Sequence, residues 1–154
     1  MAVELIENAS PELENAFAKL IPQLSKSSAP MNIEQLETFL AQDNIYLLGY
    51  FSENTGDSND GTHDKTRKLL GMLTLVTFEI PTGWRAWIED VVVDEAARGQ
   101  GAGQKLVEAA VDLANKIGAK SIDLTSRPSR EAANRLYQRC GFAMRETNIY
   151  RFQG

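Results

Sequence analysis

The sequence predicts one α/β domain over residues 1–154, with a mixed, mostly antiparallel sheet of six or seven strands flanked by about four helices. Three observations indicate this class. Segments rich in β-branched and aromatic residues alternate with segments whose apolar residues recur at helical spacing. A strand, a glycine turn and a helix follow one another within residues 87–107. The length suits one hydrophobic core and is too short for two ordinary domains.

Composition and charge restrict the ligands that this chain could bind. Hydrophobic residues make up 43% of the chain and charged residues 24%, as in ordinary globular proteins. The net charge of −5 argues against nucleic acid as a partner. Residues 1–77 hold 5 basic and 11 acidic side chains, whereas residues 78–154 hold 11 basic and 10 acidic ones. A phosphorylated ligand bound by the second half would explain this asymmetry, and so would chance.

The sequence carries no targeting, membrane or metal-binding signal. It has no apolar run of about 18 residues, and Glu4 and Glu7 stand where a signal peptide would need other residues. The only cysteine, Cys140, excludes an intrachain disulfide, and without Cys or His clusters we predict no metal site. We expect a cytoplasmic protein without a membrane partner.

Local signals in the first 40 residues predict a strand and two helices. Residues 3–6 form a short apolar run suited to an edge strand. Ser10 and the proline after it mark the beginning of a helix over residues 11–24. Asn32 and Gln35 have the spacing of a capping box, so a second helix begins after them.

Three strands follow, separated by polar turns. Residues 45–51 and 69–80 are rich in β-formers and predict an antiparallel hairpin. His63, the only histidine, lies in the polar stretch between them and lacks the rigid neighbours that a general base requires. A turn signal at residues 81–83 predicts that a third strand returns over residues 84–94.

The pattern over the rest of the chain predicts a helix, a strand, a second helix and a last strand or hairpin. The helix after the glycine turn ends at Gly118, a natural residue for a helix C-terminus. Residues 121–125 predict a strand parallel to the previous one, because a full helix connects the two. A helix over residues 131–139 and a strand or hairpin within residues 142–152 complete the prediction.

The glycine turn indicates a site for phosphate. Three glycines alternate with other residues from Gly99 to Gly103, and without Cβ atoms they let backbone N–H groups approach an anion. The helix that follows adds unpaired N–H groups and the positive end of its dipole. The third glycine of a dinucleotide fingerprint would fall on Gln104 or Leu106, and no P-loop tripeptide is present. Both common nucleotide motifs are therefore excluded.

The same turn resembles the signature of the GNAT superfamily of N-acetyltransferases, in which Arg or Gln is followed by two residues, Gly, one residue, and Gly or Ala. The resemblance implies a GNAT fold with acetyl-CoA as co-substrate. It also implies that the valine strand before the turn pairs with the pantetheine arm. The cofactor-binding residues implied here are Val91, Val92, Val93, Arg98, Gly99, Gln100, Gly101, Ala102, Gly103 and Gln104.

A second resemblance to the GNAT family lies in the Leu-Tyr-x-x-x-Gly-Phe pattern that begins at Leu136 and ends at Phe142. Arg130, Asn134 and Tyr137 stand at i, i+4 and i+7, on one face of the predicted helix. Many members of the family carry Asn where this chain has Arg130. The resemblance assigns both Arg130 and Asn134 to cofactor binding and leaves open how they divide that role.

The resemblance makes Tyr137 the general acid. When an amine attacks a thioester a thiolate leaves, and a phenol with a pKa of about 10 can protonate it within hydrogen-bond reach. The alternative is an aromatic packing residue whose hydroxyl is satisfied elsewhere. Cys140 is predicted on the core side of its helix without a nearby His or Asp, so direct transfer in a ternary complex is favoured over a cysteine-bound intermediate.

Glu89 and Asp90 are the candidate bases, since they stand on a predicted buried strand where an unpaired carboxylate is costly. Regular alternation puts Glu89 on the face of Val91 and Val93, and Asp90 on the opposite face with Val92; a bulge would exchange the faces. We favour Glu89, with Asp90 behind it. An ion pair with an arginine such as Arg85 or Arg127 is the structural alternative.

Together these patterns predict transfer of acetyl from acetyl-CoA to a primary amine of a small molecule or peptide. A non-catalytic acyl-CoA sensor and a nucleotide-binding protein are the alternatives. Acidic helices near the N-terminus favour a cationic acceptor. The sequence leaves monomer and homodimer open.

Overall fold

The structure is a computed structural model that describes residues 3–52 and 67–153. The polar stretch that carries His63 lies outside the described residues. The elements in chain order are β1 (Val3–Ile6), α1 (Pro11–Leu24), α2 (Ile33–Leu40), β2 (Ile45–Phe51), β3 (Leu69–Ile80), β4 (Gly83–Val93), the 3₁₀ helix η1 (Glu95–Ala97), α3 (Ala102–Ile117), β5 (Ser121–Asp123) and α4 (Glu131–Arg139).

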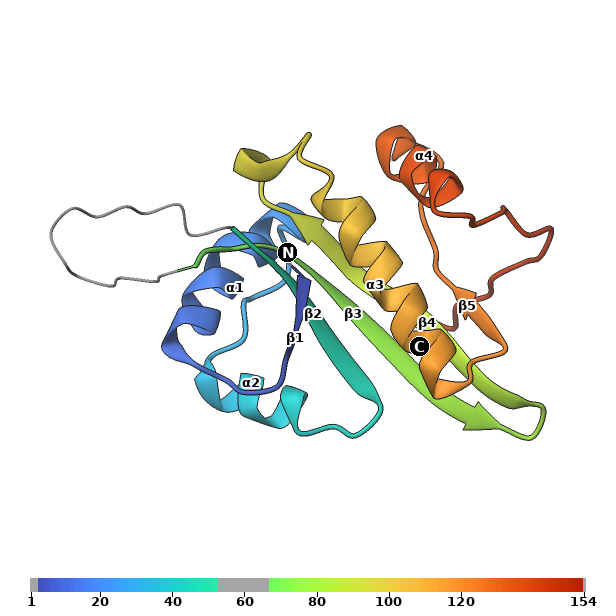
Figure 1. Ribbon diagram of the computed structural model, residues 1–154, viewed down its shortest axis with the longest axis horizontal. Coiled ribbons are helices and arrows are strands. Elements are labelled where there is room, and N and C mark those ends of the chain that lie inside the picture. The colour runs from blue at the N-terminus through green and yellow to red at the C-terminus, as the bar shows by residue number, and fades with distance from the viewer. Residues whose placement is uncertain (1–2, 53–66, 154) are drawn as a thin grey trace, which may run out of the picture.

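The strands form a sheet in the order β1-β2-β3-β4-β5, with the predicted strand 3–6 at one edge (Figure 1). Neighbours from β1 to β4 pair antiparallel, whereas β4 and β5 pair parallel, as the helix between them requires. The mixed, mostly antiparallel α/β fold is thus confirmed. Within the described residues the sheet has five strands instead of the predicted six or seven.

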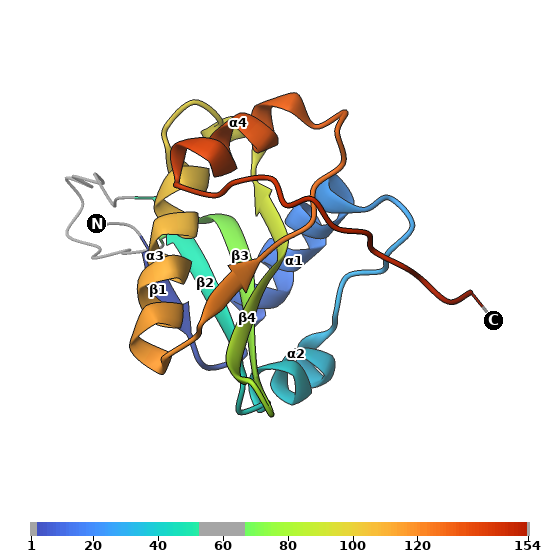
Figure 2. The ribbon, with the colours of Figure 1, turned by 90° about the vertical axis from the view of Figure 1, so that its right-hand side faces the viewer.

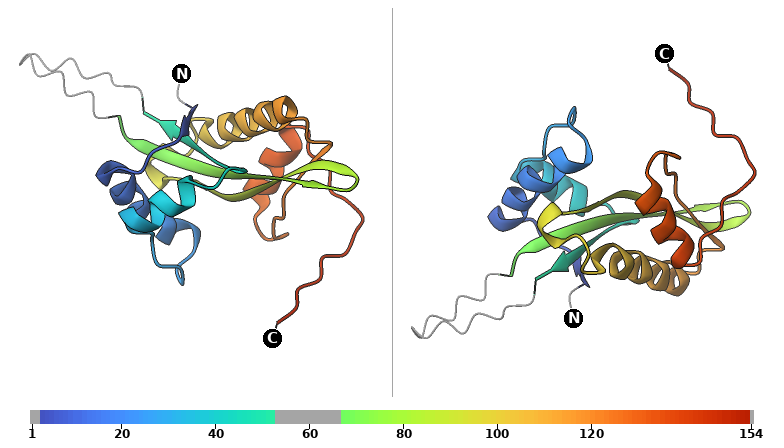
Figure 3. Two further views of the ribbon diagram at one scale, coloured as in Figure 1. Left: turned by 90° about the horizontal axis from the view of Figure 1, so that it is seen from below. Right: turned by 90° about the horizontal axis from the view of Figure 1, so that it is seen from above.

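Helices cover both faces of this sheet. Figure 3 shows α1 and α2 on one face and α3 on the other. The core on the α3 face includes Leu73 and Leu106, and the core on the α1 face includes Leu20 and Val92. Each fully buried Leu or Val contributes about 1.5–3 kcal/mol relative to an exposed one.

The described helices are amphipathic rather than uniformly apolar. The longest, α3, has 16 residues and buries one stripe of them. In the described part of the chain, no helix combines the length and the apolar character needed to cross a bilayer.

Local capping signals place most element boundaries where the sequence predicts them. The Ser10 hydroxyl accepts a hydrogen bond of 3.1 Å from the Leu13 N–H at the beginning of α1. Asn32 and Gln35 form a complete capping box, with both hydrogen bonds at 2.9 Å. Gly118 ends α3 in the left-handed region, with φ of 97°.

One irregularity of the sheet shapes the site: β4 contains a β-bulge. Met72 pairs with Val92 and Thr74 with Glu89, so two residues of β4 oppose one residue of β3. Asp90, in the bulge, has φ of +50°, the left-handed region that Asp tolerates better than most residues.

The bulge reverses the alternation of side chains along β4. Ile88 and Val91, three residues apart, both pack on the α3 side, and Val92 packs on the α1 side. Glu89 therefore lies on the face of Val92, not on the face of Val91 and Val93 as regular alternation predicts.

The segment after α4 corrects the predicted last strand over residues 142–152. It has no strand pairing, and Figure 2 shows it passing β5 and then leaving the body of the protein. Its large apolar side chains are exposed: Tyr150 is 88% and Phe152 is 92% exposed. Alternating apolar residues predict a strand only where a neighbouring edge can pair, and β5 offers three residues, a short template.

These exposures predict opposite results for two substitutions. Leu75→Ala, in the core at 0% exposure, should lower the free energy of unfolding by about 2–5 kcal/mol. Tyr150→Ser should change the free energy of unfolding by no more than about 0.5 kcal/mol, because the Tyr150 side chain is exposed. Urea denaturation measures both. A loss above about 1 kcal/mol for Tyr150→Ser would show that the tail is packed in solution.

Candidate functional site

A cavity of 1470 Å³ lies between the end of β4, the segment after β5, the beginning of α3 and most of α4. In Figure 1 the loop after β4, the beginning of α3 and α4 lie together at the upper end of the molecule. Of the predicted cofactor residues, those that line the cavity are Val91, Val92, Val93, Arg98, Gly99, Gly101, Ala102, Gly103, Gln104 and Arg130. Gln100 and Asn134 do not line it.

The cavity exists because β4 and β5 separate. Their parallel pairing ends at Trp87 and Asp123, although β4 continues to Val93. The predicted strand over residues 121–125 is therefore two residues shorter. Residues 124–127 turn away toward α4, so the backbone groups of β4 that face β5 have no strand partner beyond Trp87.

The loop before α3 presents a row of backbone N–H groups to this cavity. Among the described residues, none of the N–H groups of residues 99–104 donates a hydrogen bond, and the first helical bond runs from Lys105 to the Gly101 carbonyl. Gly99 and Gly101 have φ of 85° and 77°, which other residues adopt only with strain. No side chain caps α3. The free amides and the helix dipole together suit an anion.

A third glycine lets α4 approach α3. A Cβ atom on Gly103 would lie 3.0 Å from the side chain of Leu136, closer than ordinary packing allows. Because this contact joins the glycine loop to the helix of Tyr137, it fixes the two sides of the cavity against each other.

Asp94 anchors the loop to α1. Its carboxylate lies 2.8 Å from the Lys19 ammonium and accepts a hydrogen bond of 3.2 Å from the Ala96 N–H. The nearby Gln23 side chain accepts a hydrogen bond of 3.1 Å from the Glu95 N–H. The pKa of Asp94 is lowered, chiefly by Lys19 and then by Ala96, so the carboxylate is ionised at neutral pH.

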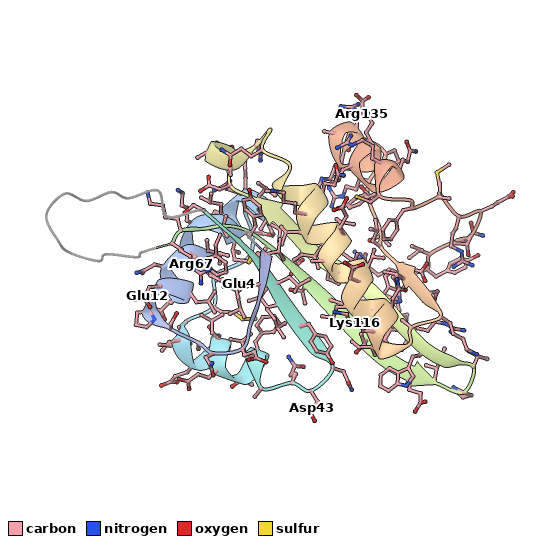
Figure 4. The ribbon with its side chains drawn as sticks, viewed as in Figure 1. Glu4, Glu12, Asp43, Arg67, Lys116 and Arg135 are labelled. Carbon is pink, nitrogen blue, oxygen red and sulfur yellow. The ribbon has the colours of Figure 1, made fainter. Side chains whose placement is uncertain are left out.

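The lining is strongly basic, with one acidic side chain, Glu131. Figure 4 labels one of its arginines, Arg135, on α4. The arginines along the cavity are Arg98, Arg127, Arg130, Arg135, Arg139 and Arg151. Guanidinium groups bind phosphate oxygens in a bidentate geometry, so this lining suits a ligand with several phosphate groups.

Tyr137 lines the same cavity and belongs to the core on the α3 side. It is 7% exposed, its ring meets Phe142 edge to face at 6.3 Å, and its hydroxyl makes no hydrogen bond with a described residue. Burial raises the pKa of the Tyr137 phenol above 10.0, an effect that the nearby Arg130 partly opposes. The phenol is therefore protonated at neutral pH, the form that an acid needs.

Asn134 and Arg130 occupy different positions relative to the cavity. Arg130 lines it from the residue before α4. The Asn134 side chain instead donates a hydrogen bond of 3.0 Å to the Arg127 carbonyl, so it holds the turn that presents Arg130.

Glu89 and Asp90 are both exposed, which corrects the premise that they stand on a buried stretch of strand. Neither lines the cavity. In the part of the chain that the structure describes, neither forms an ion pair. Arg85, one candidate partner, donates to the Trp84 carbonyl and to Thr82.

Cys140 does not line the cavity. The pKa of its thiol is raised, mainly by burial and secondarily by Glu108, so the thiol stays protonated at neutral pH. A thiolate nucleophile is not available at this position.

The sequence-based prediction missed three parts of the lining, one of which is Ile149 and Arg151 in the segment after α4. Thr125, Ser126 and Ser129 follow the parallel strand β5, and the rule that ligands bind at the carboxyl ends of parallel strands could have indicated them. Gln23 and Leu24, at the end of α1, carry no local signal, because their role depends on how α1 packs near β4.

Fold and site together define an α/β protein with a basic cavity, between two separating parallel strands, that suits a phosphorylated ligand. Residues 24–142 match the model of the Acetyltransferase (GNAT) family. The chain is 30% identical over 140 residues to an uncharacterized N-acetyltransferase, YhdJ, of Bacillus subtilis, which covers 88% of this chain and 89% of that protein. It therefore belongs to the GNAT acetyltransferase family.

Two further comparisons agree. The chain is 35% identical over 107 residues to N-alpha-acetyltransferase 30 of Schizosaccharomyces pombe, covering 70% of this chain and 71% of that protein. A solved structure of a putative acetyltransferase from Agrobacterium tumefaciens superposes with a TM-score of 0.77 at 22% identity, covering 99% of this chain and 100% of that one. The structural comparison supports the fold.

The anchor at Asp94 predicts a pH-dependent contribution to stability. Because the folded pKa lies below the ordinary 3.8, the contribution is present above that value and is lost as pH falls through the folded pKa. Asp94→Asn should lower the melting temperature at pH 7, and its difference from the unmodified chain should shrink as the pH falls below 3.8. Glu95→Gln is the matched control. A difference that persists unchanged in acid would contradict the ion-pair assignment.

Proposed function

We propose that this chain transfers an acetyl group from acetyl-CoA to a primary amine of a small molecule or peptide by direct transfer in a ternary complex. The observation that carries the proposal is that the cavity joins the free amides of residues 99–104 to the protonated hydroxyl of Tyr137. Members of the family generally use acetyl-CoA as co-substrate. We place the reaction in the cytoplasm, without nucleic acid, membrane or metal.

The lining fits acetyl-CoA in three respects. The amides of residues 99–104 and the Arg98 side chain would hold the diphosphate, and Arg130 would add a further cation. The unpaired backbone edge of Val91–Val93 would bind the amide groups of the pantetheine arm, as an added strand would. Acetyl-CoA, when bound, supplies an activated acyl group on a thiol that leaves as thiolate.

Tyr137 is the proposed general acid. Its hydroxyl has no described partner, so it is free to donate to the departing sulfur, and its raised pKa keeps the proton on it up to alkaline pH. The buried ring and the contact with Phe142 hold that hydroxyl in place.

Glu89 is the proposed base, with Asp90 behind it. The bulge turns Glu89 toward the α1 face and away from the edge of β4 that would bind pantetheine. An acceptor amine could approach Glu89 from the α1 side. Because Glu89 is exposed, its carboxylate can receive the amine proton through water. The similarity to N-alpha-acetyltransferase 30 supports a peptide N-terminus as one acceptor class.

Replacement of Tyr137 tests the acid. Tyr137→Phe should lower kcat by about 10²–10⁴-fold, because the proton donor is lost, while acetyl-CoA binding measured by calorimetry is retained. A thiol-release assay with a panel of amines and peptides measures turnover. Tyr50→Phe is the matched control, since Tyr50 is also 7% exposed in the same core but does not line the cavity.

Two results would count against this assignment. Unchanged turnover in Tyr137→Phe would remove the acid role. Acetyl-CoA binding by the unmodified chain without thiol release for any acceptor would favour the non-catalytic sensor instead.

The base is tested by comparing two isosteric substitutions. Glu89→Gln should lower kcat/KM by about 10²–10⁴-fold, because the group that receives the amine proton is lost. Asp90→Asn should have a smaller effect, because Asn also tolerates the left-handed backbone found here. Equal losses in the two variants, or none in Glu89→Gln, would overturn the choice of Glu89.

A further inference from the structure

Ser126 carries a polar atom that the fold leaves without a partner. Among the described residues, its Oγ is the buried side-chain oxygen or nitrogen that makes no hydrogen bond. Most buried polar atoms in proteins are paired, since an unpaired one costs free energy. A hydroxyl can donate one hydrogen bond and accept two, so Ser126 has unused capacity.

Ser126 itself lines the cavity, together with its neighbours Thr125 and Arg127. Ser126 therefore differs from a serine enclosed in the core, because it borders the space in which a ligand would bind. Its loss of water is compensated only when a ligand supplies the partner.

Strand register places Ser126 along the cavity. Arg85 pairs with Ser121 and Trp87 with Asp123 in the parallel ladder. If the strands continued in step, Ser126 would stand opposite Asp90, at the bulge. The glycine loop begins beyond Val93, so Ser126 stands toward the other end of the exposed β4 edge from the anion-binding amides.

This position restricts the ligand group that Ser126 can meet. The diphosphate has its own donors in residues 99–104 and in the arginines. At the level of the bulge, the groups of acetyl-CoA that can accept a hydrogen bond are the carbonyl oxygens of the acyl-pantetheine end.

We propose that the Ser126 hydroxyl donates a hydrogen bond to a carbonyl oxygen of the acyl-pantetheine end of acetyl-CoA and thereby aligns the acyl group with Tyr137. This inference rests on the proposed function. It assigns a binding role to a residue outside the glycine loop and the tyrosine helix. Acetyl-CoA supplies the hydrogen-bond partner that Ser126 lacks in the protein.

Calorimetry with two ligands tests this inference. Acetyl-CoA carries the acyl-pantetheine arm, whereas adenosine 3′,5′-bisphosphate carries only the nucleotide end. Ser126→Ala should bind acetyl-CoA about threefold to tenfold more weakly, the effect of one lost hydrogen bond between neutral groups. Its affinity for adenosine 3′,5′-bisphosphate should stay within about twofold. Ser121→Ala, in β5 before the same segment and outside the cavity lining, should leave both affinities unchanged.

Thermal unfolding of the ligand-free variant separates binding from a structural role. Because the hydroxyl has no partner in the protein, Ser126→Ala should not lower the melting temperature. A lower melting temperature, equal weakening of both ligands, or unchanged acetyl-CoA affinity would overturn the role of Ser126. If the unmodified chain bound neither ligand, the proposed function itself would fail. If the unmodified chain bound both ligands and Ser126→Ala bound each of them as tightly as the unmodified chain does, only the Ser126 assignment would fail.

Discussion

The separation of β4 from β5 is the constraint on which the site depends. A parallel pair normally satisfies its backbone along its whole length, and here pairing ends after Trp87 and Asp123 while β4 continues for six more residues. The unpaired edge, the loop beyond Val93 and the chain beyond Asp123 then surround one cavity. If β4 and β5 paired along their whole length, they would close the cavity that borders both the glycine loop and Tyr137.

The cavity is held open by residues that also stabilise the fold. Tyr137 belongs to the core on the α3 face and lines the cavity as well. Asp94 joins the end of β4 to α1 through Lys19 and to η1 through the Ala96 N–H, so the glycine loop begins from a fixed point. Gly103 brings α3 against Leu136 of α4. The shape of the cavity and the stability of the fold therefore depend on the same contacts.

The bulge at Asp90 decides which groups share a face. It lets Val91 and Val93 stay on the α3 side and turns Glu89 toward α1. Regular alternation alone predicts the opposite arrangement for Glu89. A bulge depends on how β3 and β4 pair, and the sequence of one strand carries no reliable sign of it.

From the sequence alone one can predict the order and type of the elements as far as α4, the capped helix ends, the glycine turn and the family resemblance, because these depend on spacing and on chemistry within a few residues. The strand predicted after α4 was wrong. Ser10, Asn32 and Gly118 act on backbone groups of their own helix, so their effect could be read locally. Tertiary contacts were needed to place Glu89 on its face, to show the exposed tail at Tyr150, and to bring Gln23 into the lining. They were also needed to show that the Ser126 hydroxyl lacks a partner. Each of these depends on a contact, or on the lack of one, between segments far apart in the chain.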